Sequence, residues 1–173
     1  MQQHILFVCL GNICRSPLAK AIFNHQISEK GLGEKYVADA CGTSNYHVGD
    51  RPDPRTIRNA RQHSIEIDHI GRQISVQDFS NFDLILTMDR SNLQYVNDLS
   101  AKSQNLKADI KMIRAYDPES LGLQDVPDPW YGNEQGFEEV FQMIWRSCEE
   151  LIQQLEKGKA IQKKAEKISQ TSL

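Results

Sequence analysis

The segment Ile5–Cys9 is an apolar run of branched and aromatic side chains with no polar alternation. Such a run is typical of a strand that is buried on both faces, as at the centre of a parallel sheet. A glycine-bearing turn follows over residues 10–14. Ser16 and Pro17 then suit the first positions of a helix, because Ser caps free N–H groups and Pro has no N–H to lose. The first thirty residues therefore predict a strand, a tight loop and a helix that ends near Lys30.

Along the rest of the chain, short apolar runs alternate with segments in which apolar residues recur at helical spacing. They predict strands over 36–41, 84–88 and 110–113, helices over 54–63, 91–99 and 137–155, and a long loop over 114–133. Strands that alternate with helices in this way predict a single α/β domain with a four-stranded parallel sheet, helices on both faces and a ligand-binding loop after the first strand. We place this domain at residues 1–157.

The composition is that of one ordinary globular domain: of 173 residues, 39% are hydrophobic and 25% are charged. The longest apolar stretch, Ile5–Leu10, is far shorter than the roughly 20 residues that cross a bilayer, and no cleavable leader is recognisable. The four cysteines form no C-x-x-C pair, so they predict neither a zinc ribbon nor a disulfide framework. We expect a protein of the reducing cytoplasm with no membrane span.

Charge is divided unevenly along the chain. Residues 157–173 carry five Lys and one Glu, a net +4, and the formal total of −3 leaves −7 for residues 1–156. An acidic body argues against a nucleic-acid-binding protein, which would present a basic face. We expect the Lys-rich segment 158–173 to be a frayed, solvated extension.

Cys9 and Arg15 bracket the turn after the first predicted strand, which is where ligands bind in open α/β sheets. In the predicted fold, backbone N–H groups of the loop and the dipole of the following helix converge near the Cys9 sulfur and form a cradle for an anion. A phosphate suits this cradle, since Arg15 can grip two phosphate oxygens in a planar fork. The same positive field favours a thiolate at Cys9.

A thiolate held behind phosphorus can displace an alcohol or phenol to form a cysteinyl-phosphate, which water then hydrolyses. The Ser16 hydroxyl is placed to donate to the sulfur as it leaves, and the chemistry needs no metal and no cofactor. The competing interpretation is that Cys9 is only a small buried residue at the end of a core strand. The nucleotide-binding patterns G-x-x-x-x-G-K-[ST] and G-x-G-x-x-G are absent from the sequence.

A leaving alkoxide or phenolate needs a proton, so this mechanism predicts a carboxylic acid on a second loop. Three aspartates precede a proline: Asp53, Asp117 and Asp128. Asp53 is placed to cap a helix, whereas the other two lie in the long loop, and composition does not choose between them. We favour Asp128 because the aromatic residues that follow it, Trp130 and Tyr131, suit an aromatic leaving group.

The sequence VCLGNICRSP at residues 8–17, taken with DPWYG at residues 128–132, resembles the low-molecular-weight protein tyrosine phosphatases. The resemblance covers almost the whole predicted domain. It implies hydrolysis of phosphotyrosine in proteins, with Cys9 as nucleophile, Arg15 as phosphate clamp and Asp128 as general acid and then base. It also implies tyrosine-phosphorylated proteins as substrates and a tyrosine kinase as a candidate partner.

The same resemblance implies further site residues that the sequence pattern alone does not single out. Asn12 and His69 would brace the loop by hydrogen bonds, with Ser16 as the partner of the thiolate. Cys14 matches a second loop cysteine that forms a reversible disulfide with Cys9 under oxidation. The residues implied in substrate binding are Leu10, Gly11, Asn12, Ile13, Cys14, Ser16, Tyr46, Trp130 and Tyr131.

Two positions depart from the common pattern of the resembled family, and a third bears on substrate specificity. Ala40 stands where many relatives have a Ser that helps to orient Asn12, and Trp130 replaces a frequent Tyr. Ile13 stands where relatives specialised for phosphoarginine tend to carry Thr. The aliphatic side chain favours phosphotyrosine, and a protein-arginine phosphatase is the main alternative.

Two other functions are also possible for a protein with such a loop: arsenate reduction, and binding of phosphotyrosine without hydrolysis. The related arsenate reductases use extra cysteines a short distance apart, and Cys41 and Cys148 are too separated in sequence to match that arrangement. A module that binds phosphotyrosine without hydrolysing it is disfavoured by the presence of Cys9, Arg15 and Asp128.

Overall fold

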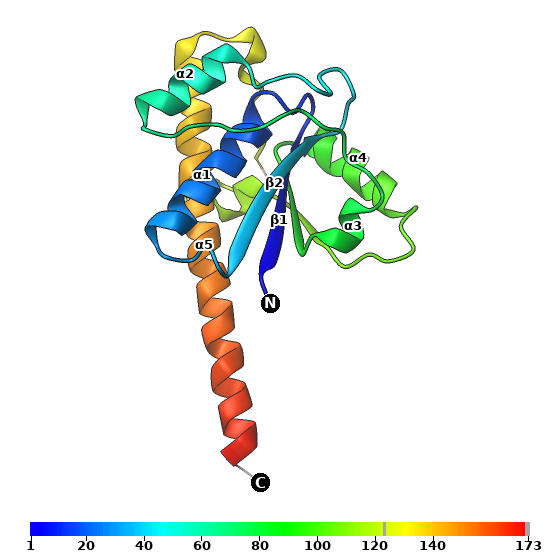
Figure 1. The fold of residues 1–173 in the computed structure, drawn as a ribbon, viewed down its shortest axis with the longest axis vertical. Coiled ribbons are helices and arrows are strands. Elements are labelled where there is room, and N and C mark those ends of the chain that lie inside the picture. The colour runs from blue at the N-terminus through cyan, green and yellow to red at the C-terminus, as the bar shows by residue number, and fades with distance from the viewer. Residues whose placement is uncertain (123, 172–173) are drawn as a thin grey trace.

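Four parallel strands form one sheet of this protein, whose computed structural model describes residues 1–122 and 124–171, with side chains through residue 158. The strands are β1 (Gln3–Cys9), β2 (Tyr36–Gly42), β3 (Leu84–Thr87) and β4 (Asp109–Met112), and their order across the sheet is β2-β1-β3-β4. β1 pairs in parallel with both β2 and β3, so it lies inside the sheet, as its unbroken apolar run predicts. The predicted four-stranded parallel sheet is confirmed (Figure 1).

Helices cover both faces of the sheet, because β1 sends alternate side chains to opposite sides. The helices are α1 (Arg15–Glu29), α2 (Pro54–Gln62), α3 (Asp78–Asn81), α4 (Arg90–Ser100) and α5 (Glu134–Thr171). Ile5 and Phe7 join a large buried cluster with side chains of α1, α2 and α5. Leu6 and Val8 join a second cluster with side chains of α3 and α4. The prediction of helices on both faces is therefore confirmed.

Apart from α5, the predicted elements end within two residues of the observed boundaries. The short helix α3 was not predicted, because four residues are too few to show a helical period. The expected long loop over 114–133 is partly wrong, since it contains the 3₁₀ helices η1 (Ile113–Tyr116) and η2 (Pro129–Tyr131). η2 begins where Oδ1 of Asp128 accepts the N–H of Trp130, and a proline occupies its first position.

α5 extends well beyond the predicted helix over 137–155. Its buried face, which includes Phe141, Ile144 and Leu151, packs in the same cluster as α1. The helix then continues through Gly158 and projects away from the sheet, orange to red in Figure 1. The end of the predicted domain is thus not marked by the end of a helix. We expected residues 158–173 to be frayed. The side chains from residue 159 onward and the whole of residues 172–173 lie outside the described residues, so this fraying stays a prediction.

No helix within the described part of the chain has the length and apolarity that crossing a bilayer requires.

Asp117 ties the segment after β4 to α5. Its buried carboxylate accepts hydrogen bonds from Nε and Nη2 of Arg146, both at 3.1 Å, and lies 3.1 Å from Nε of Arg114. Burial alone raises the pKa of Asp117, but the hydrogen bonds from Arg146 and the charges of both arginines lower it overall. The carboxylate is therefore charged in the folded protein at neutral pH.

We expect Asp117→Asn to lower the free energy of unfolding by about 3 kcal/mol at neutral pH, because the two arginines lose their shared buried counter-charge. This difference should shrink as the pH falls below about 4. A carboxylate with a lowered pKa stabilises the fold above its unfolded-state value, and that stabilisation is lost as the folded carboxylate takes up its proton. Urea denaturation at several pH values measures the effect.

The matched control is Glu119→Gln, which removes an exposed partner of the same Arg146. We expect this change to cost less than about 0.5 kcal/mol. Equal losses in the two variants would contradict the assignment of Asp117 as a buried anchor.

Candidate active site

The loop between β1 and α1 surrounds the sulfur of Cys9. Sγ accepts a hydrogen bond from the N–H of Asn12 (3.3 Å) and lies 3.0 Å from Oγ of Ser16. Asn12 has a left-handed backbone conformation (φ 59°), which Asn tolerates better than most residues. Gly42 at the end of β2 makes room for the turn, because a Cβ there would lie 2.7 Å from the carbonyl oxygen of Leu10.

The carbonyl oxygens of the loop are bound by the segment after β2. The carbonyl of Cys9 accepts from the N–H of Thr43 (2.9 Å), and that of Leu10 accepts from the N–H of Ser44 (3.0 Å). In a trans peptide the N–H points opposite to the carbonyl, so the N–H groups of Leu10 and Gly11 point away from this segment. Both residues also line a pocket. An anion cradle made of these N–H groups and the start of α1 stays a prediction.

Asn12 fixes this loop from behind. Its Nδ2 donates to Oγ of Ser16 (2.8 Å), and its Oδ1 accepts from Nε2 of His69 (2.7 Å) and from the N–H of Arg72 (2.9 Å). The structure thus brings together the three residues that were expected to brace the loop. Ala40 stands where the family resemblance places a Ser of many relatives, and here His69 and the Arg72 backbone hold the Asn12 side chain.

His69 takes part in this network as a neutral ring. Burial and the nearby charge of Lys20 lower the pKa of His69 to about 4. A neutral imidazole carries one N–H, and the bond to Asn12 assigns it to Nε2. The other ring nitrogen, Nδ1, then accepts from Nζ of Lys20 at 3.4 Å.

The hydroxyl of Ser16 has two acceptors within reach. Oγ donates to the carbonyl of Cys41 (3.2 Å) and also lies 3.0 Å from the sulfur of Cys9. Since a hydroxyl has one hydrogen, it can turn from the carbonyl toward the sulfur when the sulfur carries negative charge.

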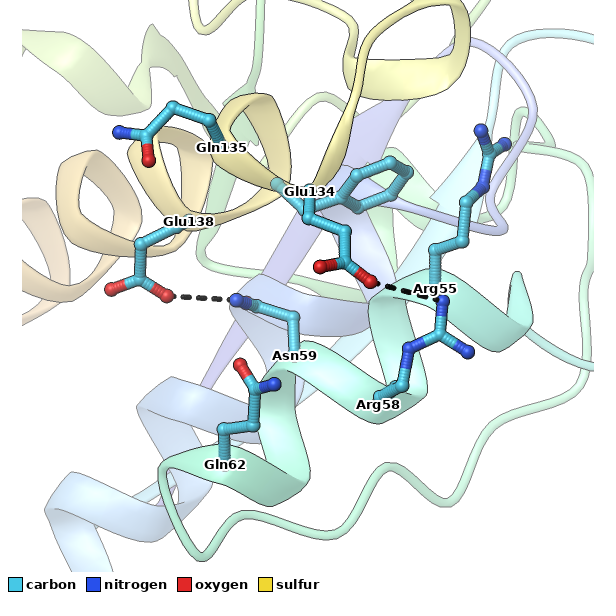
Figure 2. A pocket seen from close by; sticks show the side chains of 8 residues that line it. Arg55, Arg58, Asn59, Gln62, Glu134, Gln135 and Glu138 are labelled. Carbon is cyan, nitrogen blue, oxygen red and sulfur yellow. Dashed lines mark hydrogen bonds and ion pairs between the residues drawn. The ribbon is translucent and has the colours of Figure 1, made fainter.

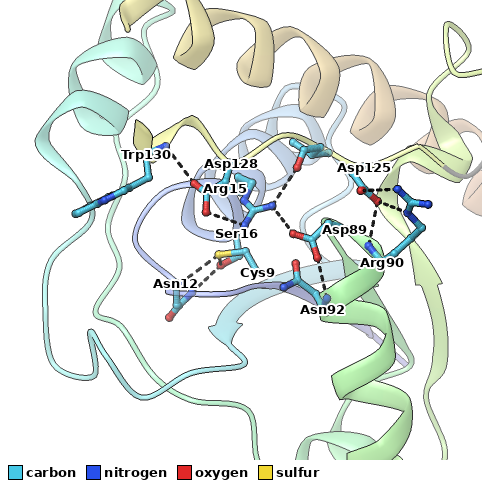
Figure 3. A network of polar contacts seen from close by, with 11 residues as sticks. Cys9, Asn12, Arg15, Ser16, Asp89, Arg90, Asn92, Asp125, Asp128 and Trp130 are labelled. Carbon is cyan, nitrogen blue, oxygen red and sulfur yellow. Dashed lines mark hydrogen bonds and ion pairs between the residues drawn. The ribbon is translucent and has the colours of Figure 1, made fainter. Parts of the chain in front are cut away.

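Arg15 is buried between two carboxylates (Figure 3). Its Nη1 donates to Oδ2 of Asp89 (2.7 Å) and to the carbonyl of Val126 (3.0 Å), and its Nη2 donates to Oδ2 of Asp128 (3.2 Å). The Arg15 side chain is only 3% exposed. Burial alone lowers the pKa of Arg15, but the negative groups of Cys9, Asp128 and Asp89 outweigh it and raise that pKa.

Asp89 is a site residue to which the sequence analysis gave no role. Its Oδ1 accepts the N–H of Asn92 and caps α4, while its Oδ2 binds Arg15. The available signal was an aspartate placed directly between a buried strand and a helical pattern. That signal identifies the cap, whereas the contact with α1 depends on the tertiary fold.

Of the three aspartates considered as the acid, all within the described residues, Asp128 alone lines the pocket that contains Cys9. Asp53 caps α2, and its Oδ1 accepts the N–H of Arg55 at 2.8 Å. Asp117 is the buried anchor described above. Position therefore favours Asp128, and its role as the acid stays a prediction.

The pocket next to the loop has a volume of about 240 Å³. Its lining contains the following predicted residues: Cys9, Leu10, Gly11, Ile13, Cys14, Arg15, Tyr46, Asp128, Trp130 and Tyr131. Asn12 and Ser16, which were also expected to bind substrate, are buried behind the loop and are not part of this lining. His47 was not predicted and lines the pocket with its ring centroid 5.9 Å from that of Trp130.

A larger hollow of about 290 Å³ lies between α2 and the start of α5 (Figure 2). Nδ2 of Asn59 donates across it to Glu138 at 2.8 Å. The hollow meets the active-site wall at Arg55, which donates to the carbonyl of Trp130 (3.1 Å). The Arg55 guanidinium carbon also lies 5.2 Å from the ring centroid of Trp130 and 4.8 Å from that of Phe137. Arg55 therefore supports the aromatic wall of the pocket from behind.

A model of one protein family, described as low molecular weight phosphotyrosine protein phosphatase, matches residues 4–162 of this chain. The chain belongs to this family.

Related proteins are similar in sequence and in structure over most of this phosphatase chain. The low molecular weight phosphotyrosine protein phosphatase of mouse is 42% identical over 149 residues, which cover 86% of this chain and 93% of the mouse protein. A crystal structure of a protein tyrosine phosphatase from Entamoeba histolytica has a TM-score of 0.85 and 38% identity, covering 91% of this chain and 99% of the other. An arginine phosphatase from Drosophila has a TM-score of 0.83 and 32% identity, covering 90% and 98%.

The four cysteines of this phosphatase are free thiols in the structure. Burial raises the pKa of Cys14 to about 12, and burial also raises the pKa of Cys41 and of Cys148. These three thiols are therefore protonated at neutral pH. The reversible disulfide between Cys14 and Cys9 stays a prediction. No cluster of metal-binding side chains occurs among the residues that the structure describes.

Brief treatment with iodoacetate at pH 7 should label Cys9 and leave the other three cysteines unmodified, because only the thiolate form reacts. Inorganic phosphate should slow this labelling at least about tenfold, since it would occupy the cradle next to the sulfur. Peptide mass spectrometry at several reaction times measures both effects. Labelling of Cys14 at the same rate as Cys9 would contradict the assignment.

Proposed function

We propose that this protein hydrolyses phosphotyrosine in proteins through a phosphocysteine intermediate. The observation that carries the proposal is the meeting of three side chains in one pocket: the sulfur of Cys9, the buried guanidinium of Arg15 and the carboxylate of Asp128. A nucleophile, a phosphate clamp and an acid are the groups that transfer of a phosphoryl group to sulfur requires. Family membership supports the same activity.

In the first step the Cys9 thiolate attacks phosphorus in line with the bond to the tyrosine oxygen. The new S–P bond forms as the P–O bond breaks, and protonated Asp128 donates its proton to the departing phenolate. Arg15 and the N–H groups of the loop stabilise the charge on the remaining phosphate oxygens. Tyrosine leaves, and the phosphoryl group stays on the sulfur.

In the second step water attacks the phosphocysteine. The Asp128 carboxylate accepts a proton from that water, the S–P bond breaks, and inorganic phosphate is released. The sulfur leaves as a thiolate, and the Ser16 hydroxyl 3.0 Å away donates to it. The thiolate of Cys9 is regenerated, so atoms and charges balance over the cycle without a metal or a cofactor.

The aromatic rim of the pocket supports a phosphotyrosine substrate. Tyr46, Trp130 and Tyr131 line its mouth, and Tyr46 and Tyr131 are largely exposed. Such side chains are suited to stack against the ring of a phosphotyrosine that reaches down to the sulfur. We infer that the substrates are tyrosine-phosphorylated proteins and that a tyrosine kinase is a candidate partner. We also infer that the reaction takes place in the cytoplasm.

Phosphoarginine is the second candidate substrate, because an arginine phosphatase from Drosophila shares the fold at 32% identity. The residue that bears on this choice is Ile13, which lines the pocket and packs against Cys14 and Phe137. Its aliphatic side chain adds apolar surface and offers no hydrogen bond to a guanidinium. We therefore place phosphotyrosine first.

Hydrolysis of para-nitrophenyl phosphate in EDTA tests the mechanism. Cys9→Ser should lower kcat more than about a thousandfold, because the nucleophile is lost. Asp128→Ala should lower kcat/KM about a hundredfold for phenyl phosphate and much less for the nitrophenyl ester, whose leaving group needs less protonation. Equal losses of Asp128→Ala on the two esters would refute the acid assignment, and full activity of Cys9→Ser would refute the phosphocysteine route.

Ile13→Thr tests the substrate class. We expect it to shift the ratio of kcat/KM for phosphoarginine over phosphotyrosine peptides about tenfold toward phosphoarginine, because it replaces apolar surface by a hydroxyl. Phosphate release from matched peptides measures the ratio. A wild-type protein that already prefers the phosphoarginine peptide would overturn our order of the two substrates.

A further inference from the structure

The segment that carries Asp128 is attached to α4 through Asp125 (Figure 3). Oδ1 of Asp125 accepts the backbone N–H of Arg90 at 3.0 Å and Nε of the same residue at 3.3 Å, and its Oδ2 accepts Nη2 at 3.3 Å. Burial alone raises the pKa of Asp125, but these bonds and the charges of Arg90 and Arg15 lower it overall. Asp125 is therefore a charged, multiply bound side chain three residues before the acid.

The attachment point is the first turn of α4, whose N–H groups have no partner within the helix. Asp89 accepts the N–H of Asn92, and Asp125 accepts that of Arg90. Two carboxylates from different segments thus share one helix N-terminus, where the helix dipole favours negative charge. Asp89 also binds Arg15, so the same turn of α4 is connected to both the phosphate clamp and the acid segment.

The chain between Asp125 and Asp128 has little freedom. Val126 is buried, its N–H donates to the carbonyl of Met88 (2.8 Å), and its carbonyl accepts from Arg15 (3.0 Å). Pro127 follows, and its ring fixes one backbone angle and restricts the residue before it. The position of Asp125 is therefore transmitted to Asp128 through a short and tightly bound piece of backbone.

We propose that Asp125 is a positioning residue for the acid and base steps, an inference that rests on the proposed function of Asp128. By fixing the segment to α4, Asp125 sets the distance between the Asp128 carboxylate and the oxygen that takes its proton. Asp125 belongs neither to the sequence motifs nor to the lining of the pocket. Its effect on Asp128 is exerted through the backbone between the two residues.

The backbone bond carries most of this effect. The Arg90 side chain is 76% exposed, and an exposed ion pair contributes little. The N–H of Arg90 stays in place whatever side chain residue 90 has. Loss of the Asp125 acceptor should therefore matter more than loss of the Arg90 guanidinium.

The test measures, in each variant, the ratio of kcat/KM for phenyl phosphate to kcat/KM for para-nitrophenyl phosphate. For Asp125→Ala we expect the ratio to fall about tenfold in favour of the nitrophenyl ester, because a misplaced acid loses part of its contribution where protonation matters most. Asp125→Asn keeps an oxygen that accepts the N–H of Arg90, so its ratio should lie within about twofold of wild type. Arg90→Ala should also stay within about twofold.

The matched control is Asp98→Ala, which removes the same charge from an exposed position further along α4. It should leave the ratio unchanged. Each ratio comes from a single preparation, so a variant that is partly unfolded does not alter it.

The outcomes separate this inference from the proposed function. A wild-type ratio in Asp125→Ala, with normal wild-type turnover that disappears in Cys9→Ser, would overturn the positioning role alone. Equal falls in Asp125→Ala and Asp125→Asn would also overturn it, since they would make the charge rather than the hydrogen bond responsible. A wild-type protein without turnover of either ester would overturn the proposed function and the inference with it.

Discussion

The buried charge of Arg15 is the constraint on which the rest of the site depends. A guanidinium removed from water needs carboxylates beside it, because an unpaired buried charge costs several kcal/mol. Asp89 and Asp128 supply that charge from two different segments, and the carbonyl of Val126 accepts a further N–H. One side chain from the first turn of α1 thus brings the start of α4 and the segment before η2 to the same place as the Cys9 sulfur. A substrate phosphate would enter a site in which the positive charge is already oriented.

A second network, made of neutral groups, lies on the other side of the loop. Asn12, Ser16 and His69 hold the shape of the turn around the sulfur without adding a charge near it. The strand β1 provides the rigid support for both networks, because it is paired on both edges and buried on both faces.

Local features of the sequence predicted much of this arrangement. The apolar run of β1 and the helix start next to Ser16 and Pro17 depend on neighbouring residues, and the structure has both elements there. The predicted cap is wrong, however, because the N-cap position is Cys14 without a side-chain hydrogen bond, and the Ser16 hydroxyl binds the carbonyl of Cys41 instead. Contacts between distant segments were not accessible in the same way. The bonds from His69 and Arg72 to Asn12 span 57 and 60 residues. His69 came from the family resemblance alone, whereas the Arg72 backbone and Asp89 were not anticipated. Asp128 was favoured over Asp117 from the aromatic residues after it and from the family resemblance, whereas its position in the pocket with Cys9 depends on the fold.

The burial of His69 as a neutral ring separates two responses to acid. Between its folded-state pKa of about 4 and the unfolded value near 6.5, the unfolded chain binds a proton that the folded protein does not. Falling pH in this range therefore favours unfolding, while the ring that orients Asn12 keeps its tautomer and its hydrogen bond. The hydrogen bond that orients Asn12 therefore persists between about pH 4 and pH 6.5, and the same burial of a neutral ring lowers the free energy of unfolding across that range.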